Sequence, residues 1–187
     1  MKNKTSYLKQ ALTFIYLMTM INIHGQVHDN HKTDVHEFKH FRAAVALGHA
    51  YIPEASNGSA DFVVIPALGL EAQYWFNRKW GIALKGDIEI ATYFVESNNE
   101  NSNEIIRKNP VIMAIPVLFS PWNNHFTFIL GPGIEFEGHE NFSIFRVGFG
   151  SEFEIGNHWD FAPEIIYDLK NGHINSLTLA IGIGKRF

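Results

Sequence analysis

Large apolar residues alternate with small or polar residues along most of the chain, and this two-residue period predicts β-strands. The alternation defines eight segments, at about 41–52, 61–76, 80–95, 109–120, 125–137, 142–155, 158–170 and 174–187. In the last segment one face holds Leu177, Leu179, Ile181 and Ile183, with Phe187 at its end. The opposite face is small or polar, which is typical of a strand between lipid and a narrow lumen.

The remaining segments repeat this division, with one exception. In the segment 109–120, Ile112 and Leu118 fall on the face that otherwise carries small residues. Proline also interrupts several segments, and we expect bulges or weakened ladder bonds there. These prolines are Pro66, Pro116, Pro132 and Pro163.

The connections between the segments alternate in length. Short turns at 77–79, 121–124 and 156–158 follow the second, fourth and sixth segments, whereas longer or more polar loops occupy 53–60, 96–108, 138–141 and 171–173. An even strand count with short turns at one end predicts an all-β fold, an eight-stranded antiparallel up-and-down transmembrane β-barrel over 41–187. The same topology puts an aromatic girdle at the short-turn end, made of Trp80, Trp122, Trp159 and Phe187.

The first 25 residues resemble a secretory signal peptide. Lys2, Lys4 and Lys9 precede an apolar run at 11–23. A run of about 13 residues is too short for a transmembrane helix, which needs about 20. We therefore expect cleavage after Gly25 and export, although a core helix is an alternative. An exported chain without a spanning helix crosses a membrane only as a closed barrel.

Residues 26–40 form a polar, His-rich segment that we expect to be a flexible periplasmic tail. It contains His28, His31, His36 and His40. Imidazole nitrogens bind Zn²⁺ or Cu²⁺, so these residues are candidate metal ligands. A solvated tail without a ligand is the alternative.

The composition narrows the functional classes. The chain has no cysteine, which excludes disulfides and thiolate metal sites, and its net charge of −4 argues against a nucleic-acid partner. We expect no cofactor.

The predicted lumen face carries more acids than bases. Its acids are Glu71, Asp87, Glu89, Glu135, Glu137, Glu152, Glu154, Asp160, Glu164 and Asp168, and its bases are Arg42, Lys85, Arg146, Lys170 and Arg186. The crowded carboxylates suggest a cation-preferring lumen or a proton-linked site. The alternative is a structural plug of ion pairs, which the narrow interior of eight strands favours.

Short turns fix the pairing of neighbouring strands in steps of two residues. The turn at 77–79 predicts Phe76 opposite Trp80 and Glu71 opposite Lys85. Corresponding registers predict Arg146 between Glu135 and Asp168. We also expect Arg42 and Arg186 to face Glu154 and Asp160 at the short-turn end.

The segment alternation, the stretch Ile115-Pro116-Val117-Leu118 and the closing Gly184-Lys185-Arg186-Phe187 carry a family resemblance. Residues 41–187 resemble the small eight-stranded outer-membrane barrels of Gram-negative bacteria, the OmpA/OmpX-like and related outer membrane protein beta-barrel domain families. The resemblance implies an outer-membrane location, contact with lipid, and recognition of Phe187 by the barrel-assembly machinery.

The sequence favours a structural or interaction role without catalysis, and it leaves alternatives open. A lipid-modifying enzyme would need a triad at the outer rim, for which the Ser/His candidates are His173 with Ser176, His139 with Ser143, and His49 with Ser56. A lipocalin-like binder would reverse the two faces of the strands. Metal capture by the His-rich tail is the remaining alternative.

Overall fold

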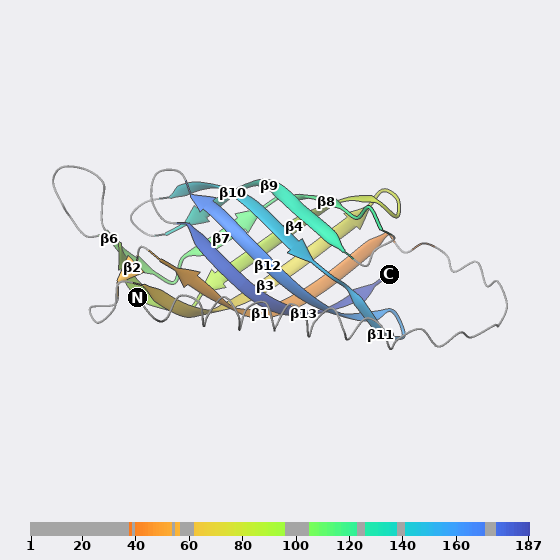
Figure 1. Cartoon of the computed structure of the whole chain (residues 1–187), viewed down its shortest axis with the longest axis horizontal. Coiled ribbons are helices and arrows are strands. Elements are labelled where there is room, and N and C mark those ends of the chain that lie inside the picture. Colours follow the sequence, from red (N-terminus) through yellow and green to blue (C-terminus); the bar gives the residue numbers. More distant parts are fainter. Residues whose placement is uncertain are drawn as a thin grey trace, which may run out of the picture. The chain divides into compact units, whose positions relative to one another are not determined.

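The computed structural model shows the strands of the chain closing into one barrel (Figure 1). It describes residues 38, 40–53, 55–56, 62–95, 105–122, 126–137, 141–170 and 175–187. All of these belong to one unit, 38–187. Within the described residues, no helix is long and apolar enough to cross a membrane.

Within the described part of the chain, the barrel wall consists of eight antiparallel segments, and we call each of these segments a stave. Their strands are β1 (Phe41–Ile52), β3 (Val63–Trp75), β4 (Trp80–Glu89), β7 (Val111–Ala114), β8 (Val117–Phe119), β9 (Thr127–Phe136), β10 (Phe142–Gly150), β11 (Phe153–Gly156), β12 (Trp159–Lys170) and β13 (Ser176–Arg186). One stave consists of β7 followed by β8, and β11 extends the stave of β10 by pairing with β12. The predicted fold class is confirmed.

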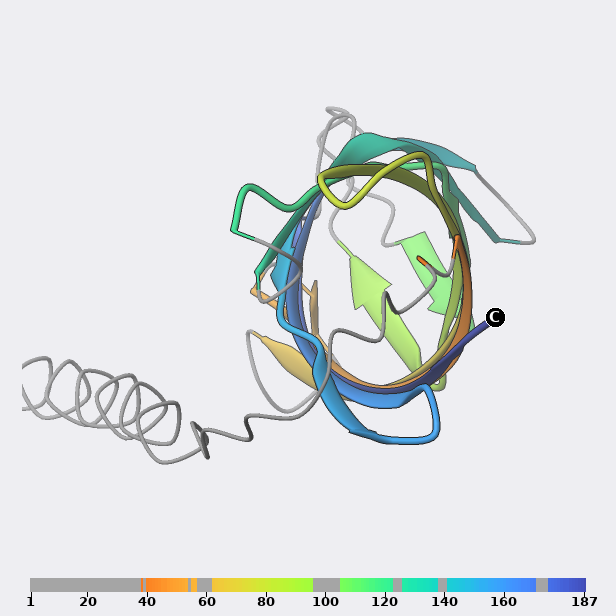
Figure 2. The same ribbon diagram turned by 90° about the vertical axis from the view of Figure 1, so that its right-hand side faces the viewer.

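The barrel closes where the last strand pairs with the first. The β13–β1 register runs from the Arg42–Arg186 pair to the Tyr51–Leu177 pair. The backbone amide of Phe187 also donates to the carbonyl of Phe41 at 2.9 Å. Figure 2 looks along the barrel and shows the strands as a continuous ring. This closure pairs β1 and β13 with each other, so neither terminal strand is left as a free edge.

The two faces of the staves differ as the alternation predicts. Large apolar side chains point outward, as shown by exposed fractions of 69% for Leu47 and 62% for Leu70. Charged side chains such as Arg42, Arg146 and Asp168 are buried in the lumen. Ile112 and Leu118 are buried on the lumen face too, so the fourth predicted segment alternates like the others but adds two large apolar side chains to the lumen.

A second, smaller sheet departs from the prediction. The expected strand 80–95 ends its barrel stave at Glu89 and resumes as β5 (Thr92–Val95). The expected loop 96–108 ends in another strand, β6 (Ile105–Lys108), which pairs with β5. β5 also pairs with β2 (Ala55–Ser56), and the three strands form a separate sheet. Alternation continues through 80–95, so the period alone does not reveal where the chain leaves the barrel.

The prolines in the staves weaken the ladder without shifting it. Pro116 separates β7 from β8, yet its carbonyl accepts a hydrogen bond from Ala83 at 2.9 Å. The registers on both sides of Pro116 are continuous. Each proline lacks an amide donor, so the ladder loses one possible hydrogen bond at that position. The expected bulge does not occur at Pro116, because the registers there are continuous.

Gly131 permits a close approach of β9 to Pro116. A Cβ atom added at Gly131 would lie 2.4 Å from the Cα atom of Pro116, which is backbone and has little room to move. We expect Gly131→Ala to lower the free energy of unfolding by about 1–3 kcal/mol, as overpacking does. The measurement is urea unfolding of the barrel in detergent micelles.

Gly86→Ala is the matched control, because a Cβ atom at Gly86 meets nothing within 4 Å. Equal stability of the two variants would contradict the packing described at Pro116.

Candidate functional site

The lumen holds the charged groups of the barrel in three clusters along its length. We call the end with the short turns and Phe187 the turn end, and the end with β2, β5 and β6 the loop end (Figure 1). The strands supply the charges from positions that share the inward face, since the side chains of a strand alternate.

The turn-end cluster is organised around Arg42 of β1. Its guanidinium donates to both carboxylate oxygens of Asp160, with Nε at 2.9 and 3.1 Å and Nη2 at 2.5 Å from the oxygens. Nη1 of Arg42 also donates to Glu71 at 3.3 Å. Lys85 Nζ lies 3.4 Å from Glu71 and 2.6 Å from Glu164. The predicted Glu71–Lys85 and Arg42–Asp160 neighbours are therefore confirmed, and Glu164 joins them.

The acidic partner of Arg186 differs from the predicted one. Its guanidinium binds Glu152, and Glu152 also lies 3.7 Å from Arg42. Glu154, the expected partner, is exposed in β11. The strand is interrupted between β10 and β11, where the backbone amide of Ser151 donates to the carbonyl of Pro163. Glu152 is therefore the last acid of this stave that reaches the lumen.

The middle cluster confirms one predicted pair of Arg146 and overturns another. Arg146 faces Asp168 in the β10–β12 register and binds it through two hydrogen bonds of 2.8 Å. Its third bond, of 2.6 Å, goes to Asp87. Glu135 lies opposite Phe142 and not opposite Arg146, because the register between β9 and β10 differs from the predicted one. The slip is an even number of residues, so every side chain keeps its face.

The loop-end cluster contains a residue that the sequence analysis missed. Arg107 of β6 is buried, binds Glu135, lies 3.6 Å from Glu137, and has its Cζ atom 4.4 Å from the ring centroid of Phe142. Lys170 also binds Glu135. The sequence predicts a loop at 96–108, and the signal that points to a further base there is the excess of acids on the predicted lumen face.

Tyr93 of β5 completes the loop-end cluster. Its hydroxyl donates to Glu89 at 2.8 Å. Burial raises the pKa of Tyr93, and the carboxylates of Glu89 and Glu135 raise it further. The phenol therefore keeps its proton and acts as a donor to Glu89.

An apolar section narrows the lumen near the turn end. Trp75, Ala83, Leu118 and Ile129 form a buried cluster, and Phe38 packs against it. The adjacent His40 is tied to β3, since its Nδ1 atom lies 2.7 Å from the carbonyl oxygen of Trp75. Residue 38 thus helps to fill the lumen from the turn end.

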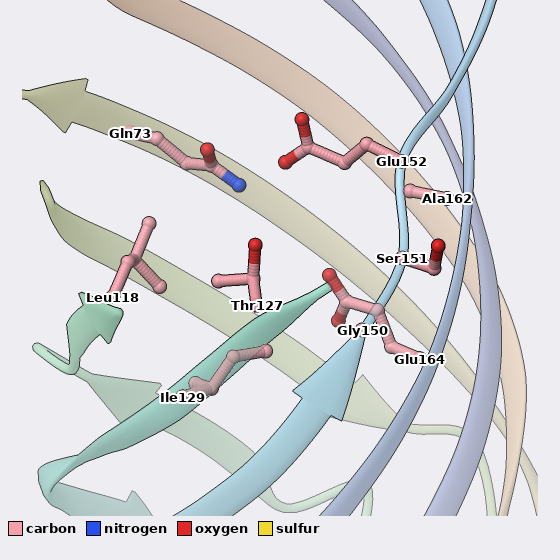
Figure 3. A pocket seen from close by; sticks show the side chains of 9 residues that line it. All are labelled: Gln73, Leu118, Thr127, Ile129, Gly150, Ser151, Glu152, Ala162 and Glu164. Atoms are coloured by element: carbon pink, nitrogen blue, oxygen red, sulfur yellow. The ribbon is translucent and has the colours of Figure 1, made fainter. Parts of the chain in front are cut away.

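A small cavity lies beside this apolar section (Figure 3). Its walls combine apolar and polar side chains: Gln73, Leu118, Thr127, Ile129, Ser151, Glu152, Ala162 and Glu164, with Gly150. The space open to the centre of a water molecule is about 10 Å³. Such a volume holds about one water and no organic ligand.

The structure describes only some of the candidate metal-binding and catalytic residues. His28, His31 and His36 lie outside the described residues, as do His139 and His173. Among the residues that the structure describes, no group of three or more His, Cys, Asp or Glu could hold a metal ion. His49 stands on the outward face of β1, whereas Ser176 is buried on the lumen face of β13.

Aromatic side chains gather at the turn end, as predicted. Trp80 packs against Phe119 with ring centroids 4.3 Å apart, and Trp122 lies 6.3 Å from Phe128. Lys185 bridges Trp159 and Phe187, with Nζ within 5.5 Å of each ring centroid. Trp80, Trp122, Trp159 and Phe187 are exposed, which is the arrangement of an interfacial aromatic girdle.

The chain matches no protein-family model and no curated protein. Its fold matches that of Neisserial surface protein A, with a TM-score of 0.52, 14% identity, and coverage of 79% of this chain and 97% of that one. The outer membrane protein OprG from Pseudomonas aeruginosa gives a TM-score of 0.50, 15% identity, and coverage of 80% and 97%. The N-terminal β-barrel domain of Pseudomonas aeruginosa OprF gives 0.50, 8%, and 79% and 99%. These matches confirm the resemblance to small outer-membrane barrels at the level of the fold. Sequence identities this low show a shared fold alone.

Removal of Arg146 tests whether the lumen is a desolvated plug. We expect Arg146→Met to lower the free energy of unfolding by about 3–5 kcal/mol, because the buried Asp168 and the partly buried Asp87 would be left as charges without this partner. Urea unfolding followed by tryptophan fluorescence measures this change.

Arg78→Met serves as the control, since Arg78 is exposed in the turn between β3 and β4. A loss of less than about 1 kcal/mol for Arg146→Met would indicate ion pairs screened by water, as at a protein surface, and an open lumen.

Proposed function

We propose that this chain is a small outer-membrane β-barrel protein of a Gram-negative bacterium, with a structural or interaction role and no catalytic activity. The observation that carries the proposal is the outward face of the barrel. Every stave exposes large apolar side chains, with Leu47, Leu70, Met113 and Ile181 as examples. An apolar surface of this extent on a water-soluble protein would be an aggregation site, whereas lipid solvates it.

The filled lumen supports a role without conduction. Ion pairs between strands that are not neighbours cross it in all three clusters, with Lys170 and Glu89 as the pair at the loop end, and the apolar section around Leu118 narrows it further. An interior of eight strands is just wide enough for side chains. The function then rests on what the barrel presents at its two ends.

The proposal gives the barrel a direction in the membrane. The turn end faces the periplasm, and the loop end faces the outside, as short and long connections do in bacterial barrels. Residues 1–25 serve as the signal peptide, and 26–40 follow in the periplasm. Phe187 at the end of β13 is the residue that the barrel-assembly machinery would recognise.

The alternatives have less support. A lipocalin-like binder needs an apolar interior, but the faces of these strands are arranged the opposite way. A lipid-modifying enzyme would need His49 or another histidine joined to a serine and an acid at the loop end. Metal capture by His28, His31, His36 and His40 stays a prediction.

A charged residue introduced on the outward face tests whether lipid or water surrounds the barrel. Leu47 lies in the middle of β1, between Leu68 of β3 and Ile181 of β13. We expect Leu47→Arg to lower the free energy of unfolding in lipid bilayers by about 2–4 kcal/mol, because arginine at the bilayer midplane is costly. Urea titration in phospholipid vesicles measures this loss.

Arg78→Leu, the reverse exchange at an exposed turn residue, is the matched control, and we expect it to be neutral. A neutral or stabilising Leu47→Arg would mean that water surrounds the barrel.

Membrane fractionation tests the location. We expect the mature chain in the outer-membrane fraction, with a gel mobility that changes on heating because the folded barrel resists detergent. The measurement is an immunoblot of separated membranes, with heated and unheated samples side by side. Recovery of the chain in the soluble periplasmic fraction would overturn the proposed location.

A further inference from the structure

The β5–β6 pair lies across the loop-end mouth of the lumen. In Figure 2, the yellow-green to green part of the chain that holds these strands falls within the outline of the ring. On one side, Tyr93 and Val95 pack into a buried apolar cluster with inward residues of β1 and β3. That cluster consists of Ala50, Ile52, Ala55, Val63, Ile65, Tyr93 and Val95.

The contact on the other side of the mouth is ionic. Arg107 of β6 reaches Glu135 and Glu137 at the end of β9 and lies over the ring of Phe142 in β10. β4 and the β7–β8 stave separate β3 from β9 in the strand order, so the pair spans the mouth. The apolar side is held by packing over several residues, whereas the ionic side is held by the guanidinium of Arg107.

Both strands join the barrel through residues that belong to no strand, although the amide of Ile90 donates to the carbonyl of Pro66 at 2.8 Å and that of Glu89 donates to the carbonyl of Pro110 at 3.0 Å. Ile90 and Ala91 connect β4 to β5, and Asn109 and Pro110 connect β6 to β7. Asn109 has a φ of 47°, a left-handed conformation that asparagine tolerates better than most residues. Its amide donates to the carbonyl of Ala91 at 2.9 Å, which ties the two connections together. They form a paired hinge at the rim.

We infer that β5 and β6 form a lid over the loop-end mouth, latched by Arg107 and hinged at these two connections. When the latch opens, the lid exposes an acidic recess, because Glu89 and Glu135 would then share Lys170 and Glu137 would lose its contact with Arg107. In the closed form Arg107 occupies this recess in place of an external cation. The lid thus controls which solutes reach the outer part of the lumen, independently of whether the whole lumen conducts.

Ser176 offers a reporter position beneath the lid. Its side chain is buried and its hydroxyl has no hydrogen-bond partner in the described part of the chain, so Ser176→Cys changes little. It follows the Tyr51–Leu177 pair in the β1–β13 register, which brings it next to Ile52 of the apolar cluster. The chain has no other cysteine, and the introduced thiol is therefore unique.

The experiment measures how fast this thiol reacts with charged methanethiosulfonate reagents in the full mature chain, folded in detergent micelles. In the Ser176→Cys background we expect slow reaction. Adding Arg107→Gln should raise the rate about tenfold or more, as loss of a charged hydrogen bond does for a local opening equilibrium. The cationic trimethylammonium reagent should gain more than the anionic sulfonate reagent, because the exposed recess is acidic.

Lys108→Gln is the matched control, since Lys108 is the next residue of β6 and is exposed. It should leave the rate unchanged. Heat-modifiable gel mobility verifies that each variant is folded, and Glu137→Gln, which removes a partner of the latch, replaces Arg107→Gln if that variant does not fold. Its expected effect is a smaller increase in the same direction.

Three results would overturn the lid. The first is an equal rate in the parent and in both latch variants. The second is an equal increase in Lys108→Gln, which would point to the general charge of β6. The third is a parent rate as high as that of a thiol introduced at the exposed Asn77, which would mean that the mouth is open already.

Discussion

The pairing of β13 with β1 is the interaction on which the rest of the structure depends. An open sheet carries two rows of unpaired amides and carbonyls at its edges, and in a bilayer these groups would cost several kilocalories each. Pairing from Arg42–Arg186 to Tyr51–Leu177 satisfies both rows. Once the sheet is closed, each strand has one face outside and one inside, and the outer face is free to be apolar.

Closure with eight staves also decides what happens inside. The lumen is so narrow that side chains from opposite walls meet, and residues far apart in sequence become partners. Arg42 binds Asp160, 118 residues away, and Lys85 binds Glu164, 79 residues away. A charge in such a space needs a partner because it has lost most of its water. Arg107 extends this logic to the loop end, where a base from outside the staves meets the acids of β9.

The lumen charges show how far reasoning from sequence reaches. Glu71–Lys85 and Arg146–Asp168 were predictable because each pair spans one hairpin, whose short turn fixes the register. The connection between β9 and β10 is less constraining, and the prediction for Glu135 slipped along the strand while keeping its face. Arg107 escaped prediction because β6 is only four residues long, too short for a clear alternation.

The sequence by itself determined the eight segments of the barrel wall, their inward and outward faces, the turn-end aromatic residues and the barrel class, because each follows from a local two-residue period and from loop length. Only the tertiary structure decided which charges meet across the lumen, that Glu152 replaces Glu154 beside Arg186, and that β5 and β6 leave the wall to cover the mouth. These features depend on the stagger and diameter of the closed sheet, which no single strand encodes.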